Sequence, residues 1–490
     1  MKPDDMGTLF DECAGSHTTV VLDRPFDIAP DGGTVYDVAG LAALVREASG
    51  WLHAAGVRRG DHVAVVKANH YDYDLLACAA IRIGAVPALI SGDLPDDTVE
   101  LLLKRLDPAL VVTDRPRSGR VLRLDDLDSI RGSAVPPPVQ RHEDDPLVVN
   151  HTSGTTGTPK LVVHTTTTIV HRLARFEAVR WPVIGVRRDD VLGNASSYAH
   201  GRTFCWTASV FCLAPREIVL LSTPSSAPAV FGEHPPTVVE ALPSAYVRWT
   251  PGPEFRDVRL FISTYDAMHP PVVRNLLHAS RRKRPLWMQG WGQTETGPLT
   301  FRFLTRKSGD LRDLGRPVPG RTRLRVVDPV TFAPVPRGET GLVLARTKAR
   351  CAGYVGERER WEAKRNGEWW NTGDLGRITR GGAVMLLDRE VDTVPGLSCL
   401  EIEDAVEDRL PSVVECVVLG VPGELPIPVV VGEVDEAGWR AATADLPPLA
   451  PPRVLRWEEI PRTGTGKVRR QELLTRLVGS AETYGTGRWT

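Results

Sequence analysis

The sequence predicts an α/β fold: a large N-terminal domain of parallel-type β-sheets with packed helices, a β-rich subdomain, and a small α+β C-terminal domain. Residues 34–145 alternate helical and strand patterns, which is typical of parallel strands covered by helices. From about 315 to 390 the chain consists of short strands bounded by glycines. After about residue 388 a new block of roughly one hundred residues begins, the size of a small domain.

The N-terminal part of the chain contains the clearest single elements. Residues 38–55 place apolar side chains at helical spacing, and residues 61–66 and 109–114 are short apolar runs that predict strands. The apolar stretch 75–90 is interrupted by Arg82 and is too short to span a bilayer. We therefore expect a buried helix followed by a strand there.

Three further predicted strands each lead into a polar or glycine-rich segment. They cover residues 147–150, 258–263 and 285–289. Because ligands of α/β proteins bind at the carboxyl ends of parallel strands, the segments after these strands are candidates for a binding site.

The β-rich subdomain and the C-terminal block are predicted from short apolar runs. Strands are expected at 323–327 and 340–344, a helix begins at 401–406, and another strand follows at 415–420. Residues 426–431 form a further strand candidate, which we place at a sheet edge because it contains two prolines.

The composition excludes several classes of protein. The 490 residues are 42% hydrophobic and 25% charged, as in a soluble globular protein. Sixty Lys and Arg against 61 Asp and Glu give a net charge of -1, so there is no electrostatic case for nucleic acid or an anionic membrane as a partner. The N-terminus is too acidic for a signal peptide. The 7 cysteines include no Cys-x-x-Cys pair, which favours reduced thiols and a cytoplasmic location.

The most informative segment is residues 151–160, His-Thr-Ser-Gly-Thr-Thr-Gly-Thr-Pro-Lys. Its glycines let backbone N–H groups approach a ligand, its hydroxyls add donors, and its lysine adds a cation, which together suit a polyphosphate. It is not the common phosphate loop, which requires Gly-x-x-x-x-Gly-Lys-Ser/Thr, because Pro159 precedes the lysine and Leu161 follows it.

Three more motifs follow this loop in order along the chain, at residues 290–297, 371–374 and 461–467. With residues 152–160 they closely resemble the adenylate-forming superfamily of acyl-CoA synthetases, adenylation domains and firefly-type luciferases. The resemblance covers nearly the whole chain. It implies an N-terminal domain at 1–387, a hinge at 388–392 and a small mobile C-terminal domain at 393–490.

The resemblance also implies ATP, Mg²⁺ and attack of a carboxylate on the α-phosphate, which gives an acyl-AMP and pyrophosphate. Bringing two anions together requires that their charges be offset. By this resemblance the glycine-rich loop holds the β- and γ-phosphates, Asp374 and Arg389 contact ribose, and Lys467 bridges the carboxylate and the α-phosphate. The predicted nucleotide-binding residues are Thr152, Ser153, Gly154, Thr155, Thr156, Gly157, Lys160, Gln289, Gly290, Trp291, Thr294, Asp374 and Arg389.

The resemblance assigns metal binding to Glu295 and Thr155, and catalytic roles to Lys467, Thr294, Glu295 and His200. Trp291 stands where the family usually has a tyrosine beside the adenine, and a tryptophan can stack there equally well, although core packing is the alternative.

The substrate side is less sharply defined by the sequence. His200 either closes the pocket or is a structural histidine. Arg202 either pairs with an anionic substrate group or is simply solvated, and we favour the structural interpretation over a substrate role. Ser263, Tyr265 and Gly290 are the other candidate substrate contacts. Thr264-Tyr265-Asp266-Ala267 replaces a common Gly-Gly-Ala run, so we expect a crowded floor and a small or flat substrate.

The largest departure from the family pattern follows Arg389. About four residues are missing there, Val391 stands at the usual hinge position, and Pro395 stands where a lysine is usual. In the family this loop helps to line the thiol tunnel. Its shortening argues against CoA or a carrier protein as the acceptor.

Three hypotheses follow. The first is an AMP-forming ligase that activates a small aromatic acid. The second keeps the fold and activates nitrite, so that an aryl amine becomes a diazo product, and the crowded floor and shortened loop motivate it. The third is a non-catalytic nucleotide-binding protein. The sequence argues against it, because it retains five residues of the family's site: Lys160, Glu295, Asp374, Arg389 and Lys467.

Overall fold

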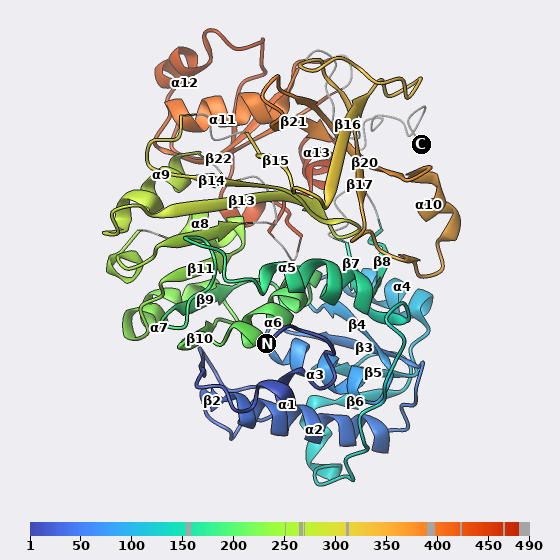
Figure 1. Cartoon of the computed structure of the whole chain (residues 1–490). Coiled ribbons are helices and arrows are strands. Elements are labelled where there is room, and N and C mark those ends of the chain that lie inside the picture. The colour runs from blue at the N-terminus through green and yellow to red at the C-terminus, as the bar shows by residue number, and fades with distance from the viewer. Residues whose placement is uncertain are drawn as a thin grey trace.

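The computed structural model describes residues 1–152, 158–249, 251–263, 268, 270–309, 313–389, 397–421, 424–463 and 466–479, without the side chains of Asp388 and Arg389. Within these ranges the strands form four sheets (Figure 1). Two large sheets carry the N-terminal helices, a smaller sheet forms the β-rich subdomain, and a three-stranded sheet forms the C-terminal domain. No described helix is both long and apolar enough to cross a bilayer.

A seven-stranded sheet confirms the predicted α/β alternation in residues 34–145. Its order is β18-β8-β7-β4-β3-β5-β6, and β7, β4, β3, β5 and β6 run parallel. The predicted buried helix and strand are α3 and β4. The elements of this region are β3 (His62–Lys67), β4 (Val86–Ser91), β5 (Leu110–Thr113), β6 (Val121–Arg123), β7 (Pro146–His151), β8 (Leu161–Thr165), β18 (Gly353–Tyr354), α2 (Val38–Ala54), α3 (Asp72–Arg82) and α4 (Asp96–Leu106).

A nine-stranded sheet in the order β15-β14-β13-β12-β11-β9-β10-β1-β2 forms the second half of the large domain. Its strands from β13 to β1 run parallel, so their carboxyl ends share one edge. The strands are β1 (Thr19–Leu22), β2 (Val35–Asp37), β9 (Val191–Ala195), β10 (Glu217–Leu220), β11 (Val238–Ala241), β12 (Leu260–Ser263), β13 (Leu286–Gln293), β14 (Gly297–Leu304) and β15 (Arg316–Pro317).

The helices of this second half include α6, which packs against the first sheet's α3, and α8, which follows β11. Of the remaining helices, α1 lies near the N-terminus and the others follow other strands. Their bounds are α1 (Leu9–Cys13), α5 (Arg175–Glu177), preceded by a π-helix at Thr167–Ala174, α6 (Gly201–Leu213), α7 (Ala227–Glu233), α8 (Pro243–Arg248) and α9 (Pro270–Ala279).

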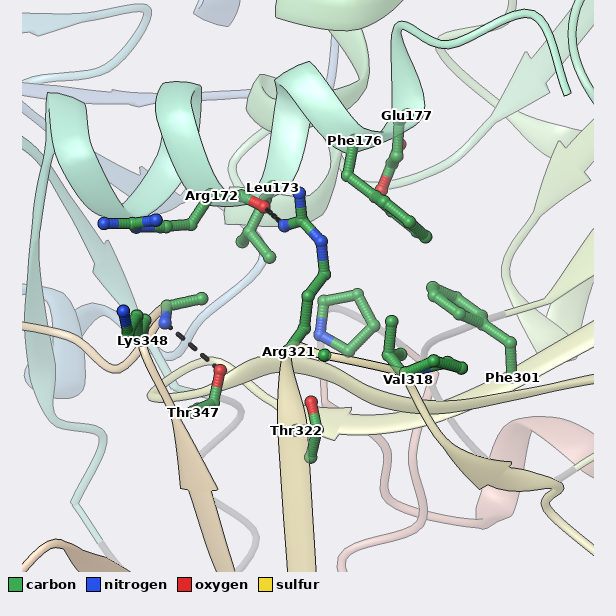
Figure 2. A pocket seen from close by; sticks show the side chains of 14 residues that line it. Arg172, Leu173, Phe176, Glu177, Phe301, Val318, Arg321, Thr322, Thr347 and Lys348 are labelled. Atoms are coloured by element: carbon green, nitrogen blue, oxygen red, sulfur yellow. Dashed lines mark hydrogen bonds between the residues drawn. The ribbon is translucent and has the colours of Figure 1, made fainter.

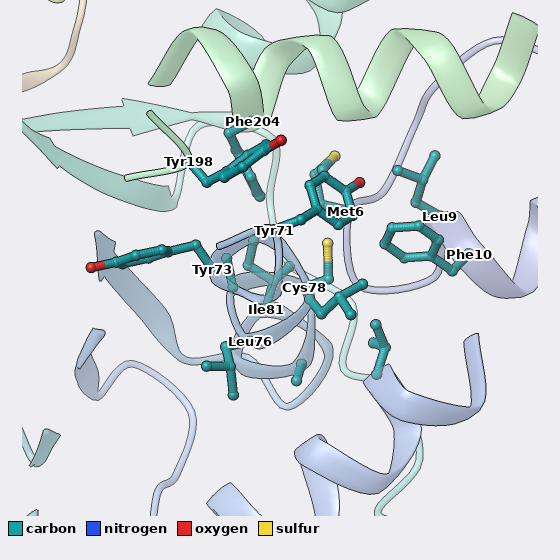
Figure 3. Packing of buried hydrophobic residues seen from close by; sticks show 14 of the residues in the cluster. Met6, Leu9, Phe10, Tyr71, Tyr73, Leu76, Cys78, Ile81, Tyr198 and Phe204 are labelled. Carbon is teal, nitrogen blue, oxygen red and sulfur yellow. The ribbon is translucent and has the colours of Figure 1, made fainter. Parts of the chain in front are cut away.

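The largest hydrophobic cluster lies where α1, α3 and α6 meet (Figure 3). The Phe10 and Phe211 rings contact edge to face at 4.8 Å, and the Tyr71 and Tyr198 rings do so at 5.5 Å. Aromatic side chains of this size contribute much of the buried apolar area of a core. This cluster fixes α6, and with it the residues just before α6, relative to the first sheet.

The β-rich subdomain is confirmed between residues 315 and 390. It comprises β16 (Thr322–Val327), β17 (Gly341–Thr347), β19 (Arg365–Asn366), β20 (Trp369–Ile378) and β21 (Val384–Arg389), with α10 (Arg358–Ala363) beside them. The predicted hinge begins inside β21, since Asp388 and Arg389 are the last residues of that strand, whereas residues 390–392 lie outside the described residues. The domain boundaries therefore stay predictions.

The predicted position of one strand in the C-terminal sheet is wrong. The run 426–431 was expected at a sheet edge, but β23 (Ile427–Gly432) lies between β22 (Val413–Leu419) and β24 (Arg453–Val454). Pro428 is tolerated because the two residues of β24 pair with Val429 and Val430, past the proline. The helices of this domain are α11 (Cys399–Arg409), α12 (Glu436–Thr443) and α13 (Arg470–Val478).

A buried ion cluster stabilises the first sheet at the end of β3. The Lys67 ammonium lies 2.6 Å from Asp27 Oδ2 and 2.7 Å from Asp72 Oδ1, and its side chain is 0% exposed. Removing one partner of a buried ion pair leaves an uncompensated charge.

We expect Lys67→Met to destabilise the protein by about 3–5 kcal/mol, because the buried Asp72 carboxylate would lose its cation, whereas Asp27 would keep Arg24. Chemical denaturation compared with wild type measures this loss. Lys104→Met, at an exposed position of α4, is the control and should change little. Equal stability of the two variants would contradict the role given to Lys67.

Candidate functional site

The base of the predicted phosphate loop is closed by two hydrogen bonds. Thr152 N–H donates to the Lys160 carbonyl at 3.0 Å, and Lys160 N–H donates to Thr152 Oγ1 at 3.0 Å. These bonds connect the end of β7 to the start of β8. Five predicted loop residues lie outside the described residues: Ser153, Gly154, Thr155, Thr156 and Gly157.

Lys160 and Glu295 meet although they are far apart in the sequence. Lys160 Nζ lies 3.3 Å from Glu295 Oε1 and 5.2 Å from the centre of the Tyr354 ring. Tyr354 Oη donates to the same Glu295 oxygen at 2.7 Å. Burial alone would raise the pKa of Glu295, but the Lys160 ammonium and the Tyr354 hydroxyl outweigh it, so the pKa is lowered. Glu295 is therefore an ionised carboxylate beside the phosphate loop.

A second buried carboxylate is oriented by two donors. Trp291 Nε1–H donates to Asp374 Oδ2 at 3.2 Å, and Gln293 Nε2–H donates to the same oxygen at 3.1 Å. Gln293 also donates to the Thr372 carbonyl at 2.6 Å. The indole of Trp291 is thus linked to Asp374, which brings the predicted adenine and ribose residues together. In the β20–β21 ladder, Asp374 is paired with Arg389, whose side chain is outside the described part.

Of the other residues on β13 and in the turn that follows it, Gln289 and Gly290 show mainly structural contacts. Gln289 Nε2–H donates to the Asp313 carbonyl at 3.1 Å. A methyl group on Gly290 would come within 3.1 Å of the Phe301 ring, so glycine here allows β14 to pack closely. Thr294 precedes Glu295 in the turn between β13 and β14.

Lys467 is carried by a tight loop of the C-terminal domain. Gly466 has φ +79°, and a methyl group there would come within 2.2 Å of Ser244 Oγ on α8. The loop therefore packs directly on the large domain. Arg462 ties it to Glu415 on β22, with one of the two contacts at 3.1 Å. The positive charge of Lys467 is among the causes that lower the pKa of His200, so the structure brings these two predicted residues together.

Three histidines lie around this point, of which His151 and His164 are buried and His200 is half-buried. His151 Nε2 accepts from Ser91 N–H at 3.1 Å, and its Nδ1–H donates to the Thr152 carbonyl at 2.8 Å. Burial lowers the pKa of His164 to about 4 and, with the neighbouring His151 and the charge of Lys467, that of His200 to about 3. Burial also lowers the pKa of His151. All three imidazoles are therefore neutral near pH 7.

His200 also caps α6, since its Nδ1 accepts the Arg202 N–H at 3.1 Å. That bond requires a lone pair on Nδ1, so the proton of the neutral ring is on Nε2. His200 thus has a structural role as the cap of α6, and its catalytic role stays a prediction.

Arg202 is bound by two carboxylates. Its Nε and Nη2 donate to the two oxygens of Glu240 at 2.7 and 2.9 Å, and its Nη1 donates to Glu177 at 2.6 Å. Glu240 is buried on β11, where it is paired with Ile262 of β12. Burial would lower the pKa of Arg202, but Glu177 and Glu240 raise it well above its ordinary value. An anionic substrate group would have to compete with both carboxylates for this arginine.

The rest of the predicted substrate side is only partly described. Ser263 is buried, and its Oγ forms no hydrogen bond within the described residues. Tyr265 lies outside them. The sequence prediction did not name Gln293, Tyr354, Glu177 or Glu240. Gln293 was available from its place inside the Trp-Gly-Gln-Thr-Glu motif, whereas the other three are recognisable only from the contacts of the folded chain.

A family model described as AMP-binding enzyme matches residues 16–355, well over half of the chain. The chain belongs to this AMP-binding family. It is an adenylate-forming ligase in fold and enzyme class, as the sequence resemblance implied.

The relatives of this AMP-binding enzyme extend over its whole length. It is 37% identical to 3-amino-2-hydroxy-4-methoxybenzoate diazotase of Streptomyces cremeus, over 97% of this chain and 96% of that protein. It is 27% identical to 3-aminoavenalumate diazotase of a Streptomyces species, over 80% of this chain and 76% of the relative. Among solved structures, ATP-bound MatB from Rhodopseudomonas palustris has the same fold, with a TM-score of 0.81 at 23% identity over 98% of this chain and 99% of that one.

The neutral histidines predict a pH dependence of stability. The pKa of His164 falls from an ordinary 6.5 to about 4 on folding. Below pH 6.5 the unfolded state therefore binds a proton that the folded state does not, so stability falls between about pH 6.5 and 4. We expect His164→Gln to reduce this slope by about 1.4 kcal/mol per pH unit, measured by denaturation at several pH values. His17→Gln, at an exposed position, should keep the wild-type slope; a wild-type slope in His164→Gln would contradict the burial effect.

The Gly466–Ser244 contact predicts a steric effect on catalysis. We expect Gly466→Ala to slow adenylation at least about tenfold, because the new methyl group displaces the loop that carries Lys467. Ser244→Gly should restore part of the rate in the double variant, since it removes the atoms that clash. Pyrophosphate release measures both effects. If Ser244→Gly restores nothing, the loss comes from the positive φ of residue 466 rather than from the clash.

Proposed function

We propose that this enzyme is an ATP-dependent diazotase, which adenylates nitrite and transfers the nitrosyl group to an aryl amine. The observation that carries the proposal is the 37% identity to a diazotase over nearly the whole of both chains. A second diazotase is also related over most of this chain.

The contacts of Arg202 supply a physical reason for a small acid. Glu177, Arg202 and Glu240 form an ion triad beside the strand end that carries Ser263. Such side chains occupy space that a larger acid would need, and breaking the Arg202–Glu240 pair would leave a buried charge without its partner. Nitrite is a small planar anion and needs only a few donors. The shortened segment after Arg389 further supports an acceptor other than a thiol.

The proposed reaction has three balanced steps. A nitrite oxygen attacks the α-phosphorus of ATP, the bond to pyrophosphate breaks, and an AMP–O–N=O anhydride forms. The amine nitrogen then attacks the nitrosyl nitrogen, the N–O bond breaks, AMP leaves with both of its bonding electrons, and the amine nitrogen loses a proton to water. The resulting N-nitrosamine tautomerises to a diazohydroxide, which takes up a proton and loses water to give the diazonium ion.

The residues of the site would divide this work between the two anions. Lys160 and the loop after Thr152 would hold the β- and γ-phosphates, and Asp374 would hold the ribose beside Trp291. Lys467 would bridge nitrite and the α-phosphate and offset their repulsion. Its position near His200 and against α8 fits the first step, in which the two anions must meet.

Glu295 fits the role of a Mg²⁺ ligand, because its lowered pKa keeps it ionised. Within the described ranges no group of three His, Cys, Asp or Glu residues could hold a metal ion. This fits Mg²⁺, which commonly takes one or two carboxylates and completes its shell with phosphate oxygens and water. When bound, the ion would offset the charge of the phosphates. Thr155 remains the second predicted ligand.

The test incubates the enzyme with ATP, Mg²⁺, nitrite and a panel of aryl amines. We expect AMP and pyrophosphate to form only with nitrite, together with a diazo product detected by azo coupling. With ¹⁸O-labelled nitrite, one label should appear in the phosphate of AMP, because the attacking oxygen stays on phosphorus. Lys467→Ala should slow AMP formation at least about a hundredfold, since it removes charge stabilisation of the transition state, whereas Lys104→Met should not.

Two outcomes would contradict the proposal. AMP formation with aromatic acids but not with nitrite would identify an aromatic acid ligase instead. ATP–Mg²⁺ binding without AMP formation from any acid would indicate a non-catalytic nucleotide-binding protein.

A further inference from the structure

A cavity of about 340 Å³ lies between the segment that ends in α5, strand β14 and the loops before β16 and after β17 (Figure 2). Its volume falls in the lower part of the range of small-molecule sites. The cavity is separate from the base of the phosphate loop at Thr152 and Lys160. None of the predicted nucleotide-binding residues that the structure describes lines it.

One side of the cavity carries three cations: Arg172, Arg321 and Lys348. Within the described part of the chain, none of them forms an ion pair with a carboxylate. Arg321 instead stacks over the Phe176 ring at 4.4 Å and donates to the Arg172 carbonyl. Burial lowers the pKa of Arg321, and the nearby charge of Arg172 lowers it further. An anionic ligand would relieve this repulsion.

The other side of the cavity is aromatic and ends in a carboxylate. Figure 2 shows Phe176, Phe301 and Glu177 on the opposite side of Arg321 from Arg172 and Lys348. Benzene rings offer faces and edges to a flat aromatic ligand. The cavity therefore has a cationic end at Arg172 and Lys348, two aromatic rings, and a carboxylate at Glu177.

Two contacts join the cavity to the candidate site. Phe301 is paired with Gly290 in the β13–β14 ladder, so its ring lies next to a predicted substrate residue. Glu177 binds Arg202, which follows His200 by two residues. The aromatic end of the cavity thus adjoins the substrate side.

We propose that this cavity binds the aryl amine co-substrate and selects amines whose ring also carries a carboxylate. The proposal rests on the proposed function. The carboxylate lies among Arg172, Arg321 and Lys348, and the ring lies against Phe176 and Phe301. The amine points toward Glu177 and Gly290, where it meets the activated nitrosyl group.

The experiment compares 3-aminobenzoate with 3-aminobenzamide, by calorimetry and by steady-state kinetics. The two ligands share the aminophenyl ring, and the first carries a charged carboxylate where the second carries a neutral carboxamide. In the Arg172→Met, Lys348→Met double variant we expect the Kd and KM of aminobenzoate to rise about tenfold or more, because charge-assisted hydrogen bonds are lost. The Kd of aminobenzamide and the KM of ATP should stay within about twofold. Lys283→Met, an exposed cation outside the cavity, is the matched control.

A second variant tests the aromatic wall. Phe301→Ala should weaken aminobenzoate and aminobenzamide equally, because both present the same ring. The cavity assignment is overturned if wild type shows no saturable binding of aminobenzoate, or if the cation variants weaken both ligands alike or neither. Absence of nitrite-dependent AMP release contradicts the proposed function itself. If nitrite-dependent AMP release continues but the substitutions do not change aminobenzoate binding, only the cavity assignment is contradicted.

Discussion

The site depends on the contact between Lys160 and Glu295, which joins the two large sheets. Lys160 precedes β8 of the seven-stranded sheet, and Glu295 lies in the turn between β13 and β14 of the nine-stranded sheet. Tyr354, on the edge strand of the first sheet, donates to the same carboxylate. Without this contact the phosphate loop and the metal-ligand candidate would belong to separate surfaces. The distance between the two sheets is thus set where the two anions must meet.

Charge is distributed unevenly around this point. Lysines approach from the large domain and from the C-terminal loop, whereas the three histidines between them stay neutral because of burial. The cations expected to meet the bound anions are therefore Lys160 and Lys467, and Lys160 is paired with the ionised Glu295 at 3.3 Å. Partial burial strengthens the interaction of a cation with a bound anion relative to bulk water.

The sequence predicted what local pattern determines. The parallel strands and the Trp-Gly-Gln-Thr-Glu motif are each contiguous, and their elements were found where expected, whereas most of the glycine-rich loop lies outside the described residues. The position of β23 could not be read in this way, because the strand that covers it, β24, is only two residues long and has no pattern of its own. Roles assigned to residues outside the described ranges, such as Thr155 and Tyr265, stay predictions.

The substrate side was the least predictable part of the site. Arg202 alone is compatible with solvent, a substrate or a structural partner, and only the fold brings Glu177 and Glu240 to it. Tyr354 reaches Glu295 from 59 residues away for the same reason. Polar residues that act through tertiary contacts carry no signal in spacing or periodicity, whereas motifs that fold back on themselves do.

The loop that carries Lys467 is anchored to its own domain at both ends. Arg462 binds Glu415 before the loop, and Arg470 binds Glu403 at 2.6 and 2.9 Å after it. These two ion pairs attach the ends of the loop to β22 and α11. If the C-terminal domain moves as the sequence resemblance implies, the charge of Lys467 travels with β22 and α11 rather than by motion of one side chain.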